Sequence, residues 1–149
     1  MGFKKTSETI AISFGVSEPA PNTFTQEEIA LQLDVLNNEI FVVLAVDLNP
    51  QVPDAVAGVN TDTSASLTTT SATAVANLRS TNCLADAELA IRAGGFVDGG
   101  VGFSRGAMES YTGEVDYIGL IATNNFFAQI QGTANLAAKG LDGRVWGYR

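Results

Sequence analysis

Apolar residues recur at every second position along much of this chain, a period of two that is typical of β-strands with one buried face. In residues 8–17, the side chains of Ile10, Ile12, Phe14 and Val16 alternate with small or polar ones. The pattern predicts a half-buried strand over this stretch. The two prolines that follow, in residues 17–25, predict a turn or an extended connection.

A second alternation lies in residues 28–36, where a glutamine and an aspartate separate apolar positions. A helix would scatter these apolar side chains around its axis, so a strand is favoured. The apolar positions are Ile29, Leu31, Leu33 and Val35.

Residues 39–49 predict a third strand with two apolar faces. It follows Asn37 and Asn38, which predict a turn because asparagine tolerates positive φ. Because every position from 40 to 46 is apolar, we expect both faces of this strand to be covered. One face would carry Ile40, Val42, Leu44, Val46 and Leu48, and the other Phe41, Val43 and Ala45.

The middle of the chain mixes two kinds of pattern. Residues 63–71 are rich in threonine and serine, which favours an edge or surface strand, with a mobile loop as the alternative. Residues 82–95 repeat Leu84, Ala87, Glu88 and Ile91 at helical spacing and end in two glycines. This stretch therefore predicts a helix of about three turns.

The last third predicts three more strands. Residues 115–132 indicate a hairpin that turns at 123–125, with Tyr117, Gly119 and Ile121 facing Phe126, Ala128 and Ile130. Residues 143–149 predict a closing strand. This strand pattern is still running at Arg149, so we expect that the natural chain extends further.

Together these elements predict a mainly β fold: an antiparallel, jelly-roll-like β-sandwich with one or two short helices. Seven or eight strands without a βαβ alternation favour this class, and no internal repeat points to a solenoid or propeller. We expect a single domain over 1–149, with residues 1–6 as a flexible N-terminal tail. A chain of 149 residues can bury a substantial core.

Composition narrows the functional classes. The chain is 46% hydrophobic, only 16% charged and carries a net charge of −8, with no basic patch to neutralise phosphates. We therefore expect no direct nucleic-acid binding. No apolar run approaches the ~20 residues that span a bilayer, so no membrane span is expected. One cysteine, Cys83, excludes an internal disulfide framework.

Residues 98–106 contain two patterns that resemble active-site sequences. Residues 102–106 match GxSxG and would place Ser104 as a nucleophile, but the chain has no histidine to serve as its base. The glycines at 100, 102 and 106 lack the long following helix that holds a dinucleotide. We interpret them as loop glycines that permit positive φ or close approach by another chain. No catalytic residue is predicted.

Carboxylates occur singly along the chain, which is typical of a solvated acidic surface rather than of a glycosidase pair. No EF-hand spacing is present, although calcium bridging between subunits stays open. We therefore predict no metal-binding or cofactor-binding residues and no cofactor. The scattered positions are Asp34, Asp47, Asp54, Asp62, Asp86, Glu88, Asp98, Glu109, Glu114 and Asp116.

Two further features have a functional and a structural interpretation. Cys83 lies at the start of the predicted helix, whose N-terminus would lower the thiol pKa, but a buried inert thiol is the favoured interpretation. A second feature is a set of aromatic residues that could form a sugar-stacking platform, although packing in the core or against a subunit is favoured. They are Phe126, Phe127, Trp146 and Tyr148.

Residues 41–58 and 116–149 resemble small structural proteins of environmental, marine-type viruses, such as capsid or other virion components. The resemblance implies a self-assembling shell or capsid-surface subunit, located in the virion, without catalysis. Its partners would be copies of itself in a symmetric homo-oligomer, together with other virion proteins. The near absence of a basic N-terminal arm argues against direct genome contact.

Strands with two apolar faces and few charges agree with this expectation, because identical copies can cover extra apolar surface. Two alternatives stay open: a non-viral extracellular assembly or adhesion module, such as a surface-layer or filament subunit, and a carbohydrate-binding β-sandwich. The sequence does not distinguish a major coat protein from a decoration, vertex or tail component.

Overall fold

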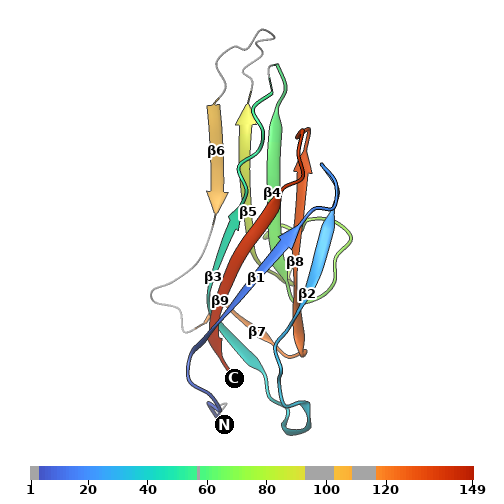
Figure 1. The fold of residues 1–149 in the computed structure, drawn as a ribbon. Helices are drawn as coiled ribbons and strands as arrows, with labels where there is room; N and C mark the ends of the chain where they lie inside the picture. The colour runs from blue at the N-terminus through green and yellow to red at the C-terminus, as the bar shows by residue number, and fades with distance from the viewer. Residues whose placement is uncertain (1–3, 57, 93–102, 109–116) are drawn as a thin grey trace.

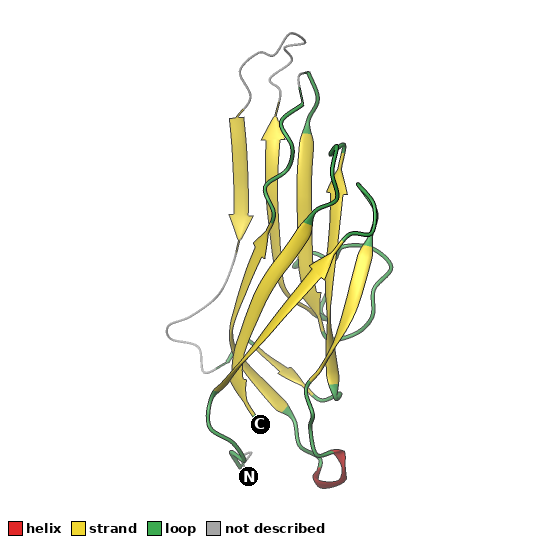
Figure 2. Cartoon of the chain, viewed as in Figure 1, coloured by secondary structure: helices red, strands yellow, loops and turns green. Residues whose placement is uncertain are grey.

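The computed structural model describes residues 4–56, 58–92, 103–108 and 117–149. They form two antiparallel β-sheets packed face to face (Figures 1 and 2), so the predicted β-sandwich is confirmed. Sheet A has the strand order β1-β9-β3-β7, and sheet B has the order β2-β8-β4-β5-β6. The strands are β1 Ile10–Ser17, β2 Thr25–Ala30, β3 Phe41–Pro50, β4 Thr61–Thr68, β5 Cys83–Arg92, β6 Phe103–Met108, β7 Gly119–Ile121, β8 Asn125–Thr133 and β9 Gly140–Tyr148.

Strand pairing links distant parts of the chain. The first strand pairs with the last, β1 with β9, and the second pairs with the one before last, β2 with β8. Further in, β3 pairs with β7 and β4 with β5. Successive pairs therefore alternate between sheet A and sheet B, and β6 is added at the free edge of β5.

The core lies between the two sheets. Phe41 of β3 and Phe126 of β8 are fully buried there, and the ring of Phe14 meets the ring of Phe126 edge to face at 5.7 Å. This contact joins β1 in sheet A to β8 in sheet B. The strand predicted over 8–17 is confirmed as β1, and its alternate apolar residues face this core. The closing strand is confirmed as β9.

A β-bulge in β3 changes which residues face inward. The register with β9 shifts between Val43 and Ala45, so the inward positions move from Phe41 and Val43 to Val46 and Leu48. The strict alternation predicted along 39–49 is therefore wrong, because the extra residue of a bulge exchanges the inward-facing and outward-facing positions in the part of the strand that follows it.

The second predicted strand, over 28–36, is shorter than expected. β2 ends at Ala30, and Gln32 has a positive φ of 56°, which breaks the extended backbone. Leu31 and Leu33 nevertheless reach the core. The next residues, Val35–Asn37, form the short 3₁₀ turn η1, and Asn38 adopts the expected positive φ at 54°.

The helix predicted over 82–95 is wrong, because residues 83–92 form β5. Alanine favours a helix, but eight residues of β4 pair with this segment and override that preference. Ala85 and Ala87 face the core, and a register shift beside Leu84 turns that side chain toward the core as well. Among the described residues, η1 is the only helical turn.

Two further expectations need correction. The threonine-rich stretch 63–71 does contain a strand, but β4 lies inside sheet B, between β8 and β5, rather than at an edge. The hairpin predicted over 115–132 does not form, because β7 belongs to sheet A and β8 to sheet B. Asn124 between them is bound elsewhere: its carbonyl accepts from Leu31 N–H, and its Oδ1 accepts from Leu33 N–H at 2.5 Å.

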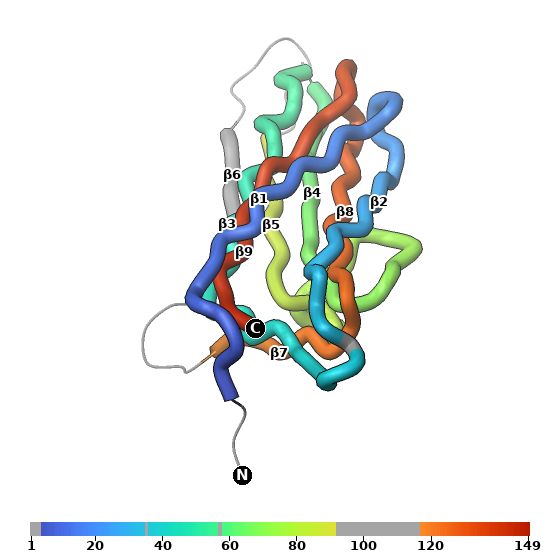
Figure 3. Tube along the Cα trace, turned by 60° about the horizontal axis from the view of Figure 1, so that its bottom comes forward, coloured from blue at the N-terminus to red at the C-terminus, as the bar shows by residue number. Residues whose placement is uncertain are grey.

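The sandwich has two distinct ends, which Figures 1 and 3 show from two directions. The terminus end holds both chain termini with segments 31–40 and 117–124, and the Thr6 N–H donates to the Arg149 carbonyl there. The loop end holds segments 18–24, 51–60 and 134–139.

Candidate functional site

The serine–glycine segment is only partly described. Residues 98–102 lie outside the described residues, whereas the backbone of 103–106 belongs to β6 and not to a loop. Ser104 pairs with Ile91 of β5 in this ladder. Its backbone is therefore part of an extended strand and not of the strand-to-helix turn on which a GxSxG nucleophile stands.

Cys83 is the first residue of β5, so the helix N-terminus considered for it does not exist. Burial raises the pKa of its thiol above the usual 9.0, and the nearby Asp86 charge adds to this. The Sγ–H donates to the carbonyl of Ala85 at 3.3 Å. These features describe an unreactive thiol.

The four aromatic residues do not form one platform. Phe126 is fully buried in the core, whereas Phe127 follows it on the outer face of sheet B. Trp146 and Tyr148 lie on the outer face of sheet A and are half-buried. The side chain of Lys5 lies over the Tyr148 ring, with Nζ at 4.9 Å from the centroid. Trp146 and Tyr148 each line a hollow, of about 190 and 360 Å³ respectively.

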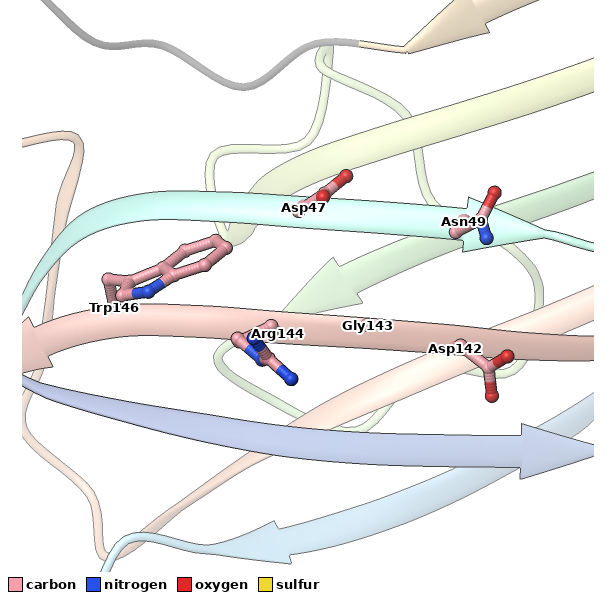
Figure 4. A pocket seen from close by; sticks show the side chains of 6 residues that line it. All are labelled: Asp47, Asn49, Asp142, Gly143, Arg144 and Trp146. Atoms are coloured by element: carbon pink, nitrogen blue, oxygen red, sulfur yellow. The ribbon is translucent and has the colours of Figure 1, made fainter.

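A shallow groove of about 190 Å³ opens beside Trp146 on the outer face of sheet A (Figure 4). The strands β3 and β9 form its floor. Their register sets Ala45 opposite Trp146 and Asp47 opposite Arg144. A third pair, Asn49 with Asp142, extends the groove toward the loop end. The groove is lined by Asp47, Asn49, Asp142, Gly143, Arg144 and Trp146.

Polar groups in this groove are mostly unengaged. Within the described part of the chain, the side chains of Asp47, Asn49 and Asp142 make no hydrogen bond or ion pair, and all three are exposed. Arg144 is held in place, because its Nε–H donates to Ser13 Oγ of β1 at 3.0 Å. Its guanidinium carbon lies 6.0 Å from the centre of the Trp146 ring. Of the two aspartates, Asp47 was predicted as a surface carboxylate, and Asp142 was not predicted as a candidate residue.

A second polar cluster closes the loop end. The carboxylate of Glu18 accepts the backbone N–H groups of Thr23, Gly132 and Lys139, although only 5% of this residue is exposed. Asn135 Oδ1 accepts from the Asp54 N–H, and its Nδ2 donates to the Asp62 carbonyl. Sequence reasoning missed this cluster, which joins three loops.

Asp54 and Lys139 form an ion pair within this end. Lys139 Nζ donates to Asp54 Oδ1 at 2.7 Å, and the lysine side chain is only 4% exposed. The other carboxylate oxygen accepts the N–H groups of Leu136 and Ala137. These contacts, led by the Lys139 hydrogen bond, lower the pKa of the Asp54 carboxyl below 3.8. Every polar atom here has a structural partner, so the cluster holds loops together.

A third polar cluster lies on the outer face of sheet B. Gln129 is fully buried there, donating to Thr68 Oγ1 and Gln26 Oε1 and accepting from Ser66 Oγ. The β4–β5 loop covers it, since Ala76 N–H donates to Ser66 Oγ. This cluster fastens the β4–β5 loop to the sheet.

The other carboxylates remain dispersed. Among the described residues, no group of three or more histidine, cysteine or acidic side chains is arranged to hold a metal ion. Asp98, Glu109, Glu114 and Asp116 lie outside the described residues.

Large apolar side chains are exposed mainly at the two ends of the sandwich. Leu36, on η1 at the terminus end, is 91% exposed, and Leu136 and Val52 at the loop end are 75% and 63% exposed. Isolated exposed apolar residues are common, whereas several gathered at one end form a candidate contact surface. The others at these ends are Tyr117 and Leu120 at the terminus end and Val59 at the loop end, while Leu78 lies on the β4–β5 loop.

No helix among the described residues is both long and apolar enough to cross a membrane. In the comparisons with known proteins, no protein-family model and no curated protein matches this chain.

Proposed function

We propose that this protein is a structural subunit that works by associating with copies of itself, as a virion shell or capsid-surface component does. The observation that carries the proposal is the exposure of large apolar side chains at both ends of the sandwich. A solitary molecule gains nothing from these groups, whereas a neighbouring copy can bury them.

The strand pairing supports the same proposal. In a jelly roll, eight strands pair first with last, second with second-last and so inward, and the pairs alternate between two sheets. With β6 set aside, the pairs β1–β9, β2–β8, β3–β7 and β4–β5 follow this order. We therefore propose a jelly-roll topology, a scaffold used by viral capsid and lectin domains. Because a fold does not fix a function, this support is by analogy.

The placement of the apolar groups favours a head-to-tail contact. The two ends carry different residues, Leu36 at one and Leu136 with Val52 at the other. Contact between unlike ends is heterologous, and it produces a closed ring or shell if the rotation closes and a filament if it does not. Both outcomes belong to a structural protein without catalysis.

Charge reversal of the exposed leucines tests the contact. In Leu36→Glu or Leu136→Glu, a carboxylate would have to be buried at the interface, so we expect each variant to dissociate to monomers where the wild type sediments as a larger species. Leu78→Glu is the matched control, because Leu78 is 51% exposed and belongs to the β4–β5 loop, which Figure 1 shows at the side of the sandwich. It should assemble as the wild type does.

Mixing the two end variants tests the direction of the contact. Each variant keeps one intact end, so the mixture should form dimers and nothing larger if unlike ends meet. A contact between like ends would instead leave one of the two variants fully associated. A wild-type protein that stays monomeric at high concentration would overturn the proposal.

Electron microscopy of the wild-type assembly separates the two structural roles. Closed particles of uniform diameter are expected for a virion component. Filaments or sheets would instead favour the surface-layer or filament alternative.

A further inference from the structure

The groove beside Trp146 lies on the outer face of sheet A, over the inner strands β3 and β9, and none of the exposed leucines lines it. End-to-end association of copies leaves this face open. The groove therefore needs an explanation of its own.

The groove combines one flat apolar surface with several hydrogen-bonding groups. The half-buried indole of Trp146 supplies the surface, and the neighbouring positions on β3 and β9 supply two carboxylates, one amide and one guanidinium. Backbone pairing of the two strands fixes the spacing of these groups, because Asp47 stands opposite Arg144 and Asn49 opposite Asp142. Sites on strands hold their side chains more precisely than sites on loops.

The polar groups offer both donors and acceptors. Carboxylates only accept, a guanidinium only donates, and an amide does both. A hydroxyl also donates and accepts, so neighbouring hydroxyls on one ligand can satisfy several of these groups together. Because Asp47, Asn49 and Asp142 have no protein partner within the described residues, a ligand would replace only water.

The charges of the groove disfavour anionic ligands. Two carboxylates repel a phosphate or sulfate, and their attraction for a cation is partly offset by the guanidinium of Arg144, which Ser13 holds in place. No group of three or more histidine, cysteine or acidic side chains among the described residues is arranged to hold a metal ion there. A neutral ligand with one apolar face and many hydroxyls fits both the charges and the indole. Pyranose rings have this character, since their C–H groups gather on one face.

We propose that the groove binds a neutral saccharide, with one sugar ring stacked on Trp146 and its hydroxyls bound by Asp47, Asn49, Asp142 and Arg144. The volume of about 190 Å³ and the open shape suit a single ring of a longer chain. The affinity of a single groove for the saccharide would be low. The overall affinity would rise when an assembly presents many grooves to one glycan surface.

Trp146 gives a direct readout, because it is the only tryptophan in the chain. The wild-type protein is titrated separately with four neutral tetrasaccharides while tryptophan emission is recorded. Each tetrasaccharide contains a single kind of sugar: glucose, N-acetylglucosamine, mannose or galactose. We expect a saturable change with at least one of them. Heparin tetrasaccharide and calcium chloride serve as ionic probes, and neither should reproduce the change. Saturable binding of an ionic probe alone, or no response to any tetrasaccharide, would overturn the proposal.

Variants then locate the binding, measured by calorimetry with the best tetrasaccharide. Trp146→Ala should weaken binding about tenfold or more, because it removes the stacking surface. Asn49→Ala should weaken binding severalfold and leave the fold intact, since the Asn49 side chain makes no hydrogen bond or ion pair within the described residues. Phe127→Ala on the outer face of sheet B is the matched aromatic control and should bind as the wild type does.

Unchanged affinity in both Trp146→Ala and Asn49→Ala would place the saccharide elsewhere and overturn the assignment. Thermal melting of each variant shows whether the fold is retained. Because Leu36→Glu removes association but not the groove, its monomers should still bind the saccharide. Failure of the assembly proposal and failure of this one are therefore distinguishable.

Discussion

Gly147 occupies a position at the centre of sheet A where no side chain fits. A Cβ atom added there would overlap the carbonyl oxygen of Val42 and come within 2.6 Å of Cε1 of Phe41. The backbone oxygen cannot move aside without disturbing the ladder between β3 and β9. Glycine is therefore required for close packing, and not for an unusual φ.

We expect Gly147→Ala to lower the free energy of unfolding by about 1–3 kcal/mol, the usual cost of overpacking a filled site. Gly15→Ala is the matched control, because a Cβ there has its nearest neighbours at an ordinary 3.6 Å. Urea titration of both variants measures the difference. Equal stabilities would show that β9 can shift to accept the methyl group.

Asp54 links stability to pH. Hydrogen bonds from Lys139 Nζ and from backbone N–H groups lower its pKa in the folded state. The stability that it contributes is therefore fully present above the unfolded value of 3.8 and is lost as the pH falls through the lower folded value.

Asp54→Asn removes this titration, so the variant should be less stable than the wild type at about pH 7, with a difference that shrinks below about pH 4. Urea unfolding at several pH values measures the difference in free energy. Asp47→Asn corrects for other effects of removing one negative charge, because the Asp47 side chain is exposed and makes no hydrogen bond or ion pair within the described residues. A difference for Asp54→Asn that stays constant with pH would mean that this carboxylate is not held ionised by its partners.

Single residues with strong conformational preferences were the easiest to predict. Asn38 adopts the positive φ expected of it. Gln32 has the same backbone conformation, at φ 56°, although glutamine has no preference for it. Such a conformation is imposed by the surrounding structure, here by the burial of Leu31 and Leu33 on either side. It leaves no local signal in the sequence.

At the scale of elements, periodicity identified β1 and β9 because their inner and outer faces differ in polarity. It failed for β5, whose apolar positions satisfy both a helical period and a period of two. The period of two is carried by Ala85, Ala87, Leu89 and Ile91. The helical period is carried equally well by Leu84, Ala87, Glu88 and Ile91. Alanine then favoured the helix, although pairing with β4 decided the outcome.

The reactivity of Cys83 distinguishes the two structures of this segment. In a strand, burial raises the thiol pKa, whereas a helix N-terminus would lower it. We expect the native protein to react with iodoacetamide at about pH 8 more slowly than glutathione does, because less thiolate is present. Unfolding in urea should bring the rate to that of a free thiol. A native rate above that of glutathione would contradict the strand assignment.

At the scale of the whole molecule, the sandwich was predictable but its strand pairing was not. The number of strands and the lack of long helices indicate the class. Pairing of β1 with β9 joins residues more than a hundred positions apart, and no local pattern encodes such a contact. The hairpin was mispredicted for the same reason, because β7 and β8 find distant partners in different sheets.

The candidate site follows the same logic. Trp146 was named from the sequence as one of four aromatic residues that could stack on a sugar, although packing in the core or against a subunit was favoured. Asp47 was visible only as a dispersed surface carboxylate, and Arg144 was not singled out, since the two become neighbours through the register of β3 with β9. A groove built across two strands is a property of the folded sheet, so sequence reasoning could not bring its residues together.

Both chain termini leave the sandwich beside η1, the segment that carries Leu36 (Figure 1). A bulky fusion partner at either terminus would therefore obstruct the same end of the sandwich, the terminus end. Switching a fluorescent protein from one terminus to the other would not relieve the obstruction. A label carried on the β4–β5 loop, beside Leu78, would leave both ends of the sandwich unhindered and report on the proposed assembly without capping it.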